Sequence, residues 1–199
     1  MLVSQKPTGC LLEIVETVVL TVLIFVGIQT FVAQPYKVQQ GSMETTLMPD
    51  QYVLVDKLSP RWDRYGRGDI VVFEPPRSYA GTQNVPFIKR IVGVAGDTVE
   101  LRDGLVYVNG TKVLEPYIFS EGGVPQTTDP APGGESTWVV PGGELFVMGD
   151  HRQDSADSRT FGPIEVSQVI GRAWLRYWPF DRLSFVVSQE HAELASPAP

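Results

Sequence analysis

Hydrophobic and polar residues follow one pattern near the start of this chain and a different one over most of the remainder. Residues 17–36, TVVLTVLIFVGIQTFVAQPY, form a run of twenty positions without a charged side chain. At about 1.5 Å per residue, a helix of this length matches the hydrocarbon thickness of a bilayer. The pattern therefore predicts one transmembrane helix over 17–36, preceded by a short N-terminal tail at 1–16.

A buried core helix or a cleavable signal peptide would show a similar apolar run. The segment before the run has Lys6 as its only side-chain cation and contains Glu13 and Glu16, and no small-x-small site follows closely. These features favour an uncleaved anchor that contacts the lipid bilayer. Lys6 and Lys37 are the nearest cations on the two sides, so the charge pattern does not decide which way the chain crosses.

Short runs of Val, Ile and aromatic residues, bounded by Gly, Pro, Asp and Asn, occupy the chain after this helix. Such runs are typical of strands, and frequent turns between them indicate a sheet sandwich or a barrel. Asp103-Gly104 is a hairpin signal that joins strands at 99–101 and 105–108. We therefore predict a mainly β protein, with an antiparallel β-sheet or barrel-like domain over 37–188 behind the transmembrane helix.

Two segments lack a strand pattern. Residues 120–134, SEGGVPQTTDPAPGG, are poor in apolar side chains and rich in Gly and Pro, which predicts a long loop or small insertion rather than a strand. The C-terminal residues 189–199, QEHAELASPAP, predict a disordered tail.

Length and composition exclude several classes of protein. A chain of 199 residues is long enough for one ordinary core but not for several domains. The net charge is −7 and there is no Lys/Arg-rich run, so we expect no nucleic-acid partner. Cys10 is the only cysteine, and His151 and His191 are the only histidines. We therefore expect no disulfide framework, no metal site and no cofactor.

The negative charge is concentrated in one part of the sequence. Between Asp97 and Asp150 there are nine acidic residues and two basic ones, Arg102 and Lys112, so this stretch carries the whole net charge. Solubility explains such a surface more simply than a site for a cation or a basic partner.

A serine near the predicted membrane exit is the first candidate for chemistry. Ser42 follows Gly41 in the segment Gln40–Glu44, and glycine leaves room for close approach to the serine backbone. A serine in such a turn is a possible nucleophile, but it also serves as an ordinary hydrogen-bonding turn residue. The turn alone does not distinguish the two roles.

A lysine in a strand pattern is the second candidate. Alternation through 87–97 places Lys89 on the same face as Ile91, so an inward Ile91 implies a buried ammonium group. A buried lysine is costly unless it loses its proton or finds a partner. The alternative is that Lys89 is solvated at the edge of the sheet.

A polar loop is the third candidate. Residues 148–159, MGDHRQDSADSR, contain Ser, Asp and Arg too densely for a strand. The side chains of this loop either buttress a site or form an ion-paired surface.

Together, and in this order behind the apolar run, the three segments resemble type I signal peptidases. GSMETTL is similar to the serine box of that family, GDIVVF to the strand that follows it, KRIVGVAGDTVEL to the lysine box and GDHRQDSADSR to the closing loop. The resemblance extends from the anchor to about Trp178. It implies a β-rich, single-pass serine endopeptidase of the plasma membrane, or of another internal membrane of a bacterium. Such an enzyme removes signal peptides from exported preproteins after small-x-small sites, with its catalytic domain on the outer side.

The resemblance also implies roles for individual residues. Ser42 corresponds to the nucleophile and Lys89 to the general base. Ser155 corresponds to the hydroxyl that holds this lysine, and Asp157 and Arg159 to a supporting pair.

The sequence departs from the family pattern at the oxyanion hole, which stabilises the negative charge of the transition state. Gln40 occupies a position where many members have a serine whose hydroxyl completes the hole. We expect the backbone N–H of Ser42 to be one donor and the side-chain amide of Gln40 to be the second. Lys89 must be neutral to act as a base, so its pKa must fall from about 10.4 to roughly 8.

An extended substrate is expected to add as a strand beside the lysine segment, through main-chain hydrogen bonds. Shallow apolar pockets would admit the small side chains of signal-peptide cleavage sites. The residues expected to form these pockets are Val38, Met43, Leu47, Phe87 and Ile88.

Two alternative functions compete with the peptidase. A self-cleaving repressor domain shares the Ser-Lys logic, but such proteins are soluble and carry a DNA-binding helical module, whereas this chain has a transmembrane run. The second alternative is a membrane-tethered β domain without activity that acts as a scaffold. Gln40 supports this alternative because it replaces the serine that completes the oxyanion hole in many members of the family. The presence of both Ser42 and Lys89 argues against this scaffold.

Overall fold

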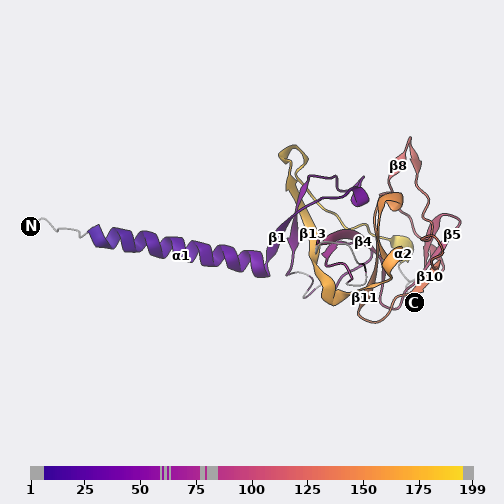
Figure 1. Cartoon of the computed structure of the whole chain (residues 1–199), viewed down its shortest axis with the longest axis horizontal. Helices are drawn as coiled ribbons and strands as arrows, with labels where there is room; N and C mark the ends of the chain where they lie inside the picture. The colour runs from indigo at the N-terminus through magenta and orange to yellow at the C-terminus, as the bar shows by residue number, and fades with distance from the viewer. Residues whose placement is uncertain are drawn as a thin grey trace, which may run out of the picture.

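A single helix, α1, extends from a β-rich body in the computed structural model of the chain (Figure 1). The structure describes residues 7–58, 60, 62, 64–76, 79 and 85–194. The helices are α1 (Pro7–Phe31), α2 (Ser158–Phe161) and the 3-10 helices η1 (Gly41–Met43), η3 (Arg152–Asp154), η4 (Val166–Gln168), η5 (Phe180–Arg182) and η6 (Ala192–Leu194). The strands are β1 (Ala33–Lys37), β2 (Tyr52–Asp56), β3 (Ile70–Phe73), β4 (Phe87–Val94), β5 (Thr98–Arg102), β6 (Leu105–Val108), β7 (Thr111–Lys112), β8 (Ser120–Glu121), β9 (Val124–Pro125), β10 (Thr137–Val139), β11 (Glu144–Met148), β12 (Ile164–Glu165), β13 (Val169–Trp178) and β14 (Ser184–Phe185).

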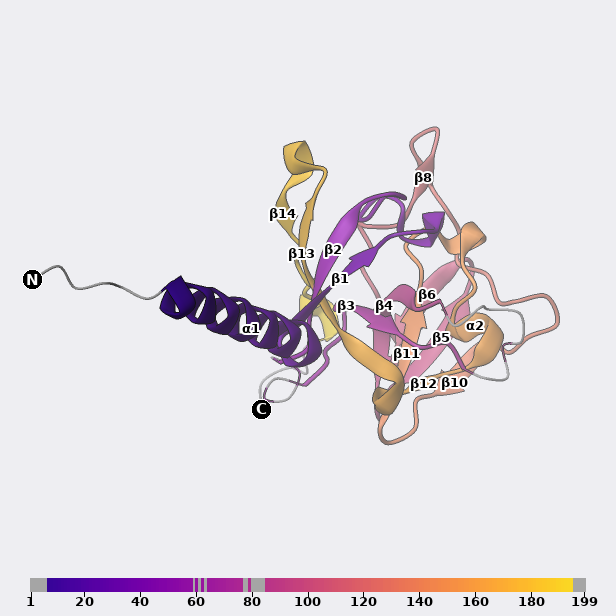
Figure 2. The same ribbon diagram turned by 60° about the vertical axis from the view of Figure 1, so that its left-hand side comes forward.

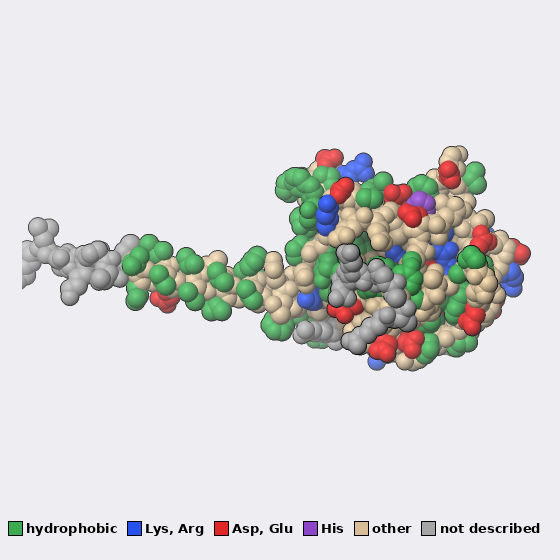
Figure 3. All heavy atoms as spheres, in the orientation of Figure 1, with side chains coloured by type: hydrophobic (Ala, Val, Ile, Leu, Met, Phe, Trp, Pro, Cys, Tyr) green, Lys and Arg blue, Asp and Glu red, His purple; other side chains and the backbone are tan. Residues whose placement is uncertain are grey.

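The predicted membrane helix is present, but its boundaries differ from those expected. Its apolar span is Leu11–Phe31, about 32 Å at 1.5 Å per residue, and its large apolar side chains are exposed (Figure 3). The prediction of helix over 17–36 is wrong at both ends, because α1 begins at Pro7 and Ala33–Lys37 form strand β1. Pro35 lacks the N–H that a helix requires, and it lies opposite Leu54 in the β1–β2 pair.

The body is built on one large antiparallel sheet, which confirms the predicted fold class. Its strands lie in the order β1-β2-β13-β3-β4-β11-β12, with β14 paired to β13. The pairing register shifts within β13 against both of its neighbours, and again within β11 against β4. Bulges of this kind bend a strand and increase its twist, and the sheet is curled (Figure 2).

A smaller sheet, β10-β5-β6-β7, packs against the large one. Val92, Phe146 and Met148 of the large sheet share an apolar cluster with Val99 and Trp138 of the small sheet. The predicted hairpin is confirmed, since β5 and β6 are joined by Asp103-Gly104 with φ of 53° and 73°. The acidic stretch of the sequence includes this small sheet.

The prediction of a loop without strands at 120–134 is wrong in part. Within this segment, β8 and β9 form a hairpin whose turn is Gly122-Gly123, with φ of 60° and 85°. Two glycines favour such a turn because both positions require positive φ.

The predicted disordered tail is ordered at 189–194. Its last described residue, Leu194, packs against the core cluster between the two sheets, and Glu193 Oε1 accepts a hydrogen bond from Leu114 N. These long-range contacts are not visible in the polar composition of the tail. Residues 195–199 of the predicted tail lie outside the described residues.

Candidate active site

The serine turn is held in place by the apolar core beneath it. Ser42 lies in η1 and is 4% exposed, and the next residue, Met43, packs with Leu47 and Val53. The backbone N–H of Leu47 donates to Met43 O at 2.8 Å, which closes the turn. Burial of these apolar residues therefore fixes the position of the serine hydroxyl.

Lys89 reaches this hydroxyl from strand β4. Lys89 Nζ donates to Ser42 Oγ at 2.6 Å and lies 3.2 Å from the carbonyl oxygen of Ile88. Lys89 is 1% exposed and Ile91 is fully buried, so the lysine is inside the sheet and not solvated at its edge. Two side chains that are 47 positions apart in the sequence thus form one buried pair.

Burial changes the proton affinity of this lysine. It lowers the pKa of Lys89 from 10.5 to about 8, and the negative charges of Asp157 and Asp150 oppose this shift only in part. About a tenth of the lysines are then neutral at pH 7, against a few in ten thousand for an unshifted lysine. Lys89 therefore has the proton affinity that a general base needs near neutral pH.

The closing loop is organised around one buried carboxylate. Asp157 accepts hydrogen bonds from Ser155 Oγ at 2.7 Å, from Gly149 N at 3.0 Å and from Arg159 at 2.9 Å. Burial alone would raise the pKa of Asp157, but its hydrogen bonds and the charge of Arg159 hold the pKa below the ordinary value. Asp157 thus stays ionised and fixes both Ser155 and Arg159.

The hydrogen bond that Ser155 donates goes to Asp157, whereas the resemblance implies that Ser155 holds Lys89. The hydroxyl proton of Ser155 is directed to the Asp157 carboxylate, which is a stronger acceptor than an amine or hydroxyl. The hydrogen bonds of Lys89 Nζ instead go to Ser42 and to the carbonyl of Ile88. A hydroxyl that donates to Asp157 keeps lone pairs to accept from an ammonium group, so the role of Ser155 beside Lys89 stays a prediction.

Gly149 is a site residue that the sequence patterns did not reveal. A Cβ at this position would lie 2.3 Å from Ser155 Oγ and 2.5 Å from the backbone oxygen of Ser42. The closing loop approaches the serine turn this closely only because glycine has no side chain. The backbone N–H of His151 also donates to Ser42 O at 3.1 Å. A glycine between Met148 and Asp150, at the end of a strand, was the only local signal.

A buried ion pair next to Lys89 was also missed. Arg90, next to Lys89 on β4, binds Asp150 through two hydrogen bonds of 2.9 and 2.7 Å, and both side chains are almost fully buried. Thr46, from the serine turn, donates to the same carboxylate at 2.6 Å. The pair thus joins the serine turn, β4 and the closing loop.

A hollow of about 140 Å³ opens beside Ser42. Four of the five predicted pocket residues, Val38, Met43, Phe87 and Ile88, line this hollow, and so does Gln40. Leu47 is not among the lining residues of this hollow, and it packs in the apolar cluster beneath the serine turn.

The side of β4 that faces the hollow lacks a partner strand near Lys89 among the described residues. Ile91 exchanges hydrogen bonds with Gly68 and Asp69 on the β3 side, so the backbone groups of Ile88 point to the opposite side by alternation. On that opposite side, β11 ends at Met148, which pairs with Arg90. An extended chain therefore has access to the backbone of Ile88.

The chemistry of the site rests on these side chains. Within the described ranges of the chain, no three His, Cys, Asp or Glu side chains converge as metal ligands would. The arrangement provides a serine hydroxyl, a buried lysine with a lowered pKa and a hollow of mixed polar and apolar lining beside a free strand edge. These are the parts that acyl transfer from an extended peptide requires.

Comparison with known proteins places these features in a family. A family model described as "Signal peptidase, peptidase S26" matches residues 11–178. A signal peptidase I of Leptolyngbya laminosa is 36% identical over 183 residues, covering 90% of this chain and 86% of the relative. One of Bacillus licheniformis is 35% identical over 187 residues, covering 90% and 95% respectively. A probable signal peptidase I-2 of Synechocystis is 34% identical over 197 residues, covering 98% and 86%.

Proposed function

Because the chain belongs to the signal peptidase family, peptidase S26, we propose that it cleaves signal peptides from preproteins with Ser42 as nucleophile and Lys89 as general base. The 2.6 Å contact between Ser42 Oγ and Lys89 Nζ, inside a buried site, is the observation that carries this assignment. Serine with a lysine base is an established variant of base-assisted acyl transfer.

In the first step, neutral Lys89 takes the proton of Ser42 while Oγ attacks the carbonyl carbon of the scissile peptide bond. Lys89 then gives this proton to the departing amine, and the acyl group stays on Ser42 as an ester. In the second step, Lys89 takes a proton from water, whose oxygen attacks the ester. Return of the proton to Ser42 Oγ releases the carboxyl end of the signal peptide.

The negative charge that develops on the carbonyl oxygen needs hydrogen-bond donors. The backbone N–H of Ser42 is one donor, and the side-chain amide of Gln40 is the second. The exposed side chain of Gln40 makes no capping bond to η1, which leaves it available, and Gln40 lines the hollow beside Ser42. Donors in such positions stabilise the transition state more than the ground state.

The substrate binds as a strand against the unpaired side of β4. Main-chain hydrogen bonds to Ile88 set its direction, and alternate side chains enter the hollow beside Ser42. A hollow of about 140 Å³ suits residues as small as alanine, which are typical of signal-peptide cleavage sites.

The enzyme is membrane-anchored, and α1 is the anchor. Its end at Phe31 is eleven positions before Ser42, and β1 follows α1 almost directly. The catalytic domain is therefore tethered beside the membrane, where signal peptides end. We place this domain on the outer side of the membrane.

Cleavage of a preprotein by the full chain in detergent tests the assignment. Ser42→Ala and Lys89→Ala are each expected to lower cleavage by more than about 10³-fold, and the double variant to be no worse, because residues acting as one unit are not additive. The control is Lys112→Ala, on the exposed strand β7, which is expected to leave the rate unchanged. Retention of a tenth of the activity by either single variant would remove that residue from the dyad.

The pH dependence provides an independent check. Activity is expected to rise with pH through an apparent pKa of about 8, because only neutral Lys89 accepts the serine proton. Lys89→Arg is expected to be inactive over the whole range, since guanidinium stays charged. Activity that rises toward acid would point to a carboxylate or histidine base instead.

A further inference from the structure

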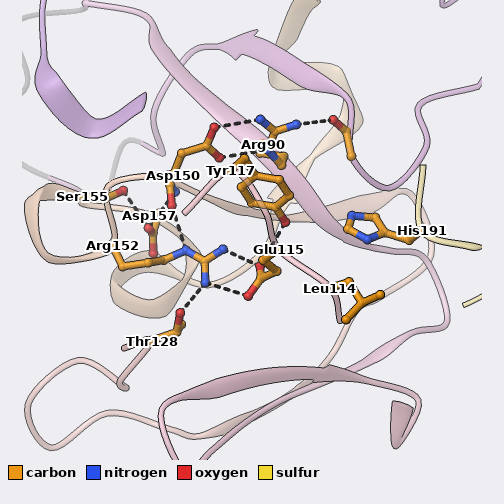
Figure 4. A network of polar contacts seen from close by, with 12 residues as sticks. Arg90, Leu114, Glu115, Tyr117, Thr128, Asp150, Arg152, Ser155, Asp157 and His191 are labelled. Atoms are coloured by element: carbon orange, nitrogen blue, oxygen red, sulfur yellow. Dashed lines mark hydrogen bonds and ion pairs between the residues drawn. The ribbon is translucent and has the colours of Figure 1, made fainter. Parts of the chain in front are cut away.

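The segment 113–119, between β7 and β8, belongs to none of the motifs recognised in the sequence. It contacts the closing loop, since Phe119 N donates to Asp150 O at 3.0 Å and Glu115 pairs with Arg152. Figure 4 shows two side chains of this segment, Glu115 and Tyr117, between the arginines of the site. Arg152 lies between Glu115 on one side and the pair Ser155 and Asp157 on the other (Figure 4). The segment is therefore placed to influence the loop that packs on Ser42.

Glu115 is the ionic partner of a fully buried arginine. The side chain of Arg152 is 0% exposed and that of Glu115 is 6% exposed, and both terminal nitrogens of Arg152 bind the Glu115 carboxylate. Thr128 accepts a further hydrogen bond from Arg152. A buried guanidinium without its carboxylate would be an uncompensated charge in the protein interior, so Glu115 determines where Arg152 lies.

Arg152 in turn closes a ring of contacts within the closing loop. Its Nε donates to Gly149 O at 2.9 Å, and its own backbone oxygen accepts from Arg159 at 2.6 Å. Arg159 and the N–H of Gly149 both bind Asp157. Gly149 is the residue that touches Ser155 and the backbone of Ser42. A displacement of Arg152 therefore reaches Ser42 through Gly149 and also through the neighbouring His151, whose N–H donates to Ser42 O.

Tyr117 connects the same carboxylate to the second buried ion pair. Its hydroxyl donates to Glu115 at 3.0 Å, and its ring lies 3.9 Å from the guanidinium carbon of Arg90. Arg90 is the neighbour of Lys89 and binds Asp150. Glu115 thus bonds Arg152 directly and reaches Arg90 through the Tyr117 ring, so it is linked to both halves of the dyad.

We propose that Glu115 is a positioning residue of the peptidase. Glu115 holds Arg152 and Gly149 in place, so that the closing loop keeps Ser42 and Lys89 aligned and excludes water from them. The inference rests on the proposed function, since alignment of the dyad matters only if the dyad is catalytic. Glu115 touches neither Ser42 nor Lys89, so it acts through Arg152.

The test begins with Glu115→Gln, which keeps the size of the side chain and removes its charge. We expect kcat to fall by about 10- to 100-fold with KM within threefold of wild type, because misplacement of reacting groups by about 1 Å costs this much. The acid limb of the pH profile is expected to move to higher pH, because a displaced loop admits water to Lys89 and weakens the main cause of its lowered pKa.

A loss of folded protein alone would lower the rate without moving the pH profile, so the profile separates positioning from stability. Glu121→Gln, on the exposed hairpin β8–β9, is the matched control and is expected to match wild type in kcat and pH profile. An unchanged kcat in Glu115→Gln, or a lower rate with the wild-type pH profile, would overturn the proposal.

A second variant keeps the proposal falsifiable if Glu115→Gln folds poorly. Combining Glu115→Leu with Arg152→Met removes both charges and fills similar space, which is often tolerated for buried ion pairs. Positioning predicts a folded enzyme with low kcat, because Gly149 O has lost its donor. A fully active double variant would show that Glu115 only neutralises Arg152, and failure of both variants to fold would show a role in stability alone.

Ser42→Ala, assayed in parallel, separates this inference from the proposed function. If Ser42→Ala is inactive while Glu115→Gln equals wild type, the positioning role is wrong and the peptidase assignment stands. If Ser42→Ala keeps its activity, the assignment of the dyad itself is wrong, and the positioning role is overturned with it.

Discussion

Replacing Lys89 by methionine is expected to abolish cleavage and to stabilise the fold at neutral pH. Methionine keeps the length and apolar stem of the side chain but carries no ammonium group to desolvate. The unfolded chain holds Lys89 with a pKa of 10.5, whereas burial lowers the pKa to about 8 in the native state. The unfolded state therefore binds more protons than the native state between these two pKa values. The free-energy penalty that burial of this lysine imposes on folding falls as pH rises through that window.

The size of the effect follows from the two pKa values. At pH 7 the shifted lysine costs the native state about 3 kcal/mol relative to an unshifted one, and at pH 10 the cost is about 1 kcal/mol. The lost hydrogen bond to Ser42 reduces the gain from methionine by about 1 kcal/mol, without the same dependence on pH. The difference in unfolding free energy between Lys89→Met and wild type should thus shrink by about 2 kcal/mol from pH 7 to pH 10.

Denaturant unfolding of the full chain in detergent, followed by tryptophan fluorescence, measures this difference at several pH values; of the four tryptophans, Trp138 is buried. Lys112→Met, on the exposed strand β7, is the control and should give a difference that does not vary with pH. A difference for Lys89→Met that is equally independent of pH would refute the argument, because it would mean that burial does not penalise the charged lysine.

Three single positions give further predictions. Gly149→Ala is expected to lower kcat by at least about 100-fold, because a Cβ would lie 2.3 Å from Ser155 Oγ. A kcat equal to that of wild type would show that the closing loop can shift to admit the Cβ without loss of activity. Gln40→Ala is expected to lower kcat about 100-fold with little change in KM, and Gln40→Ser to keep much of the activity, whereas kcat of Gln40→Ala within threefold of wild type would exclude Gln40 as an oxyanion donor. Leu194→Ala is expected to lower the unfolding free energy by about 1–2 kcal/mol in a denaturant titration, whereas a tail without contacts would give no change.

Local patterns along the chain were enough to predict much of the architecture. The uncharged run at 17–36 predicted a membrane helix, though not its boundaries, because length and apolarity alone set that property. The Asp103-Gly104 hairpin was predictable because its turn depends on two residues that accept positive φ. Alternation placed Lys89 on the same face as Ile91 but left open whether that face is buried or solvated at the edge of the sheet, and the 1% exposure of Lys89 decides for burial.

Which distant groups meet was settled by the packing of elements in three dimensions. The spacing of residues along the chain does not bring Ser42 within 2.6 Å of Lys89; the curled sheet does. Leu47 was expected to line the pocket, but it packs in the apolar cluster beneath the serine turn and does not line the hollow. Glu115 gave no local signal, because its importance depends on burial against Arg152, 37 positions later. Periodicity predicts which face of an element a side chain occupies. Which distant side chain it contacts is determined only when two elements pack together.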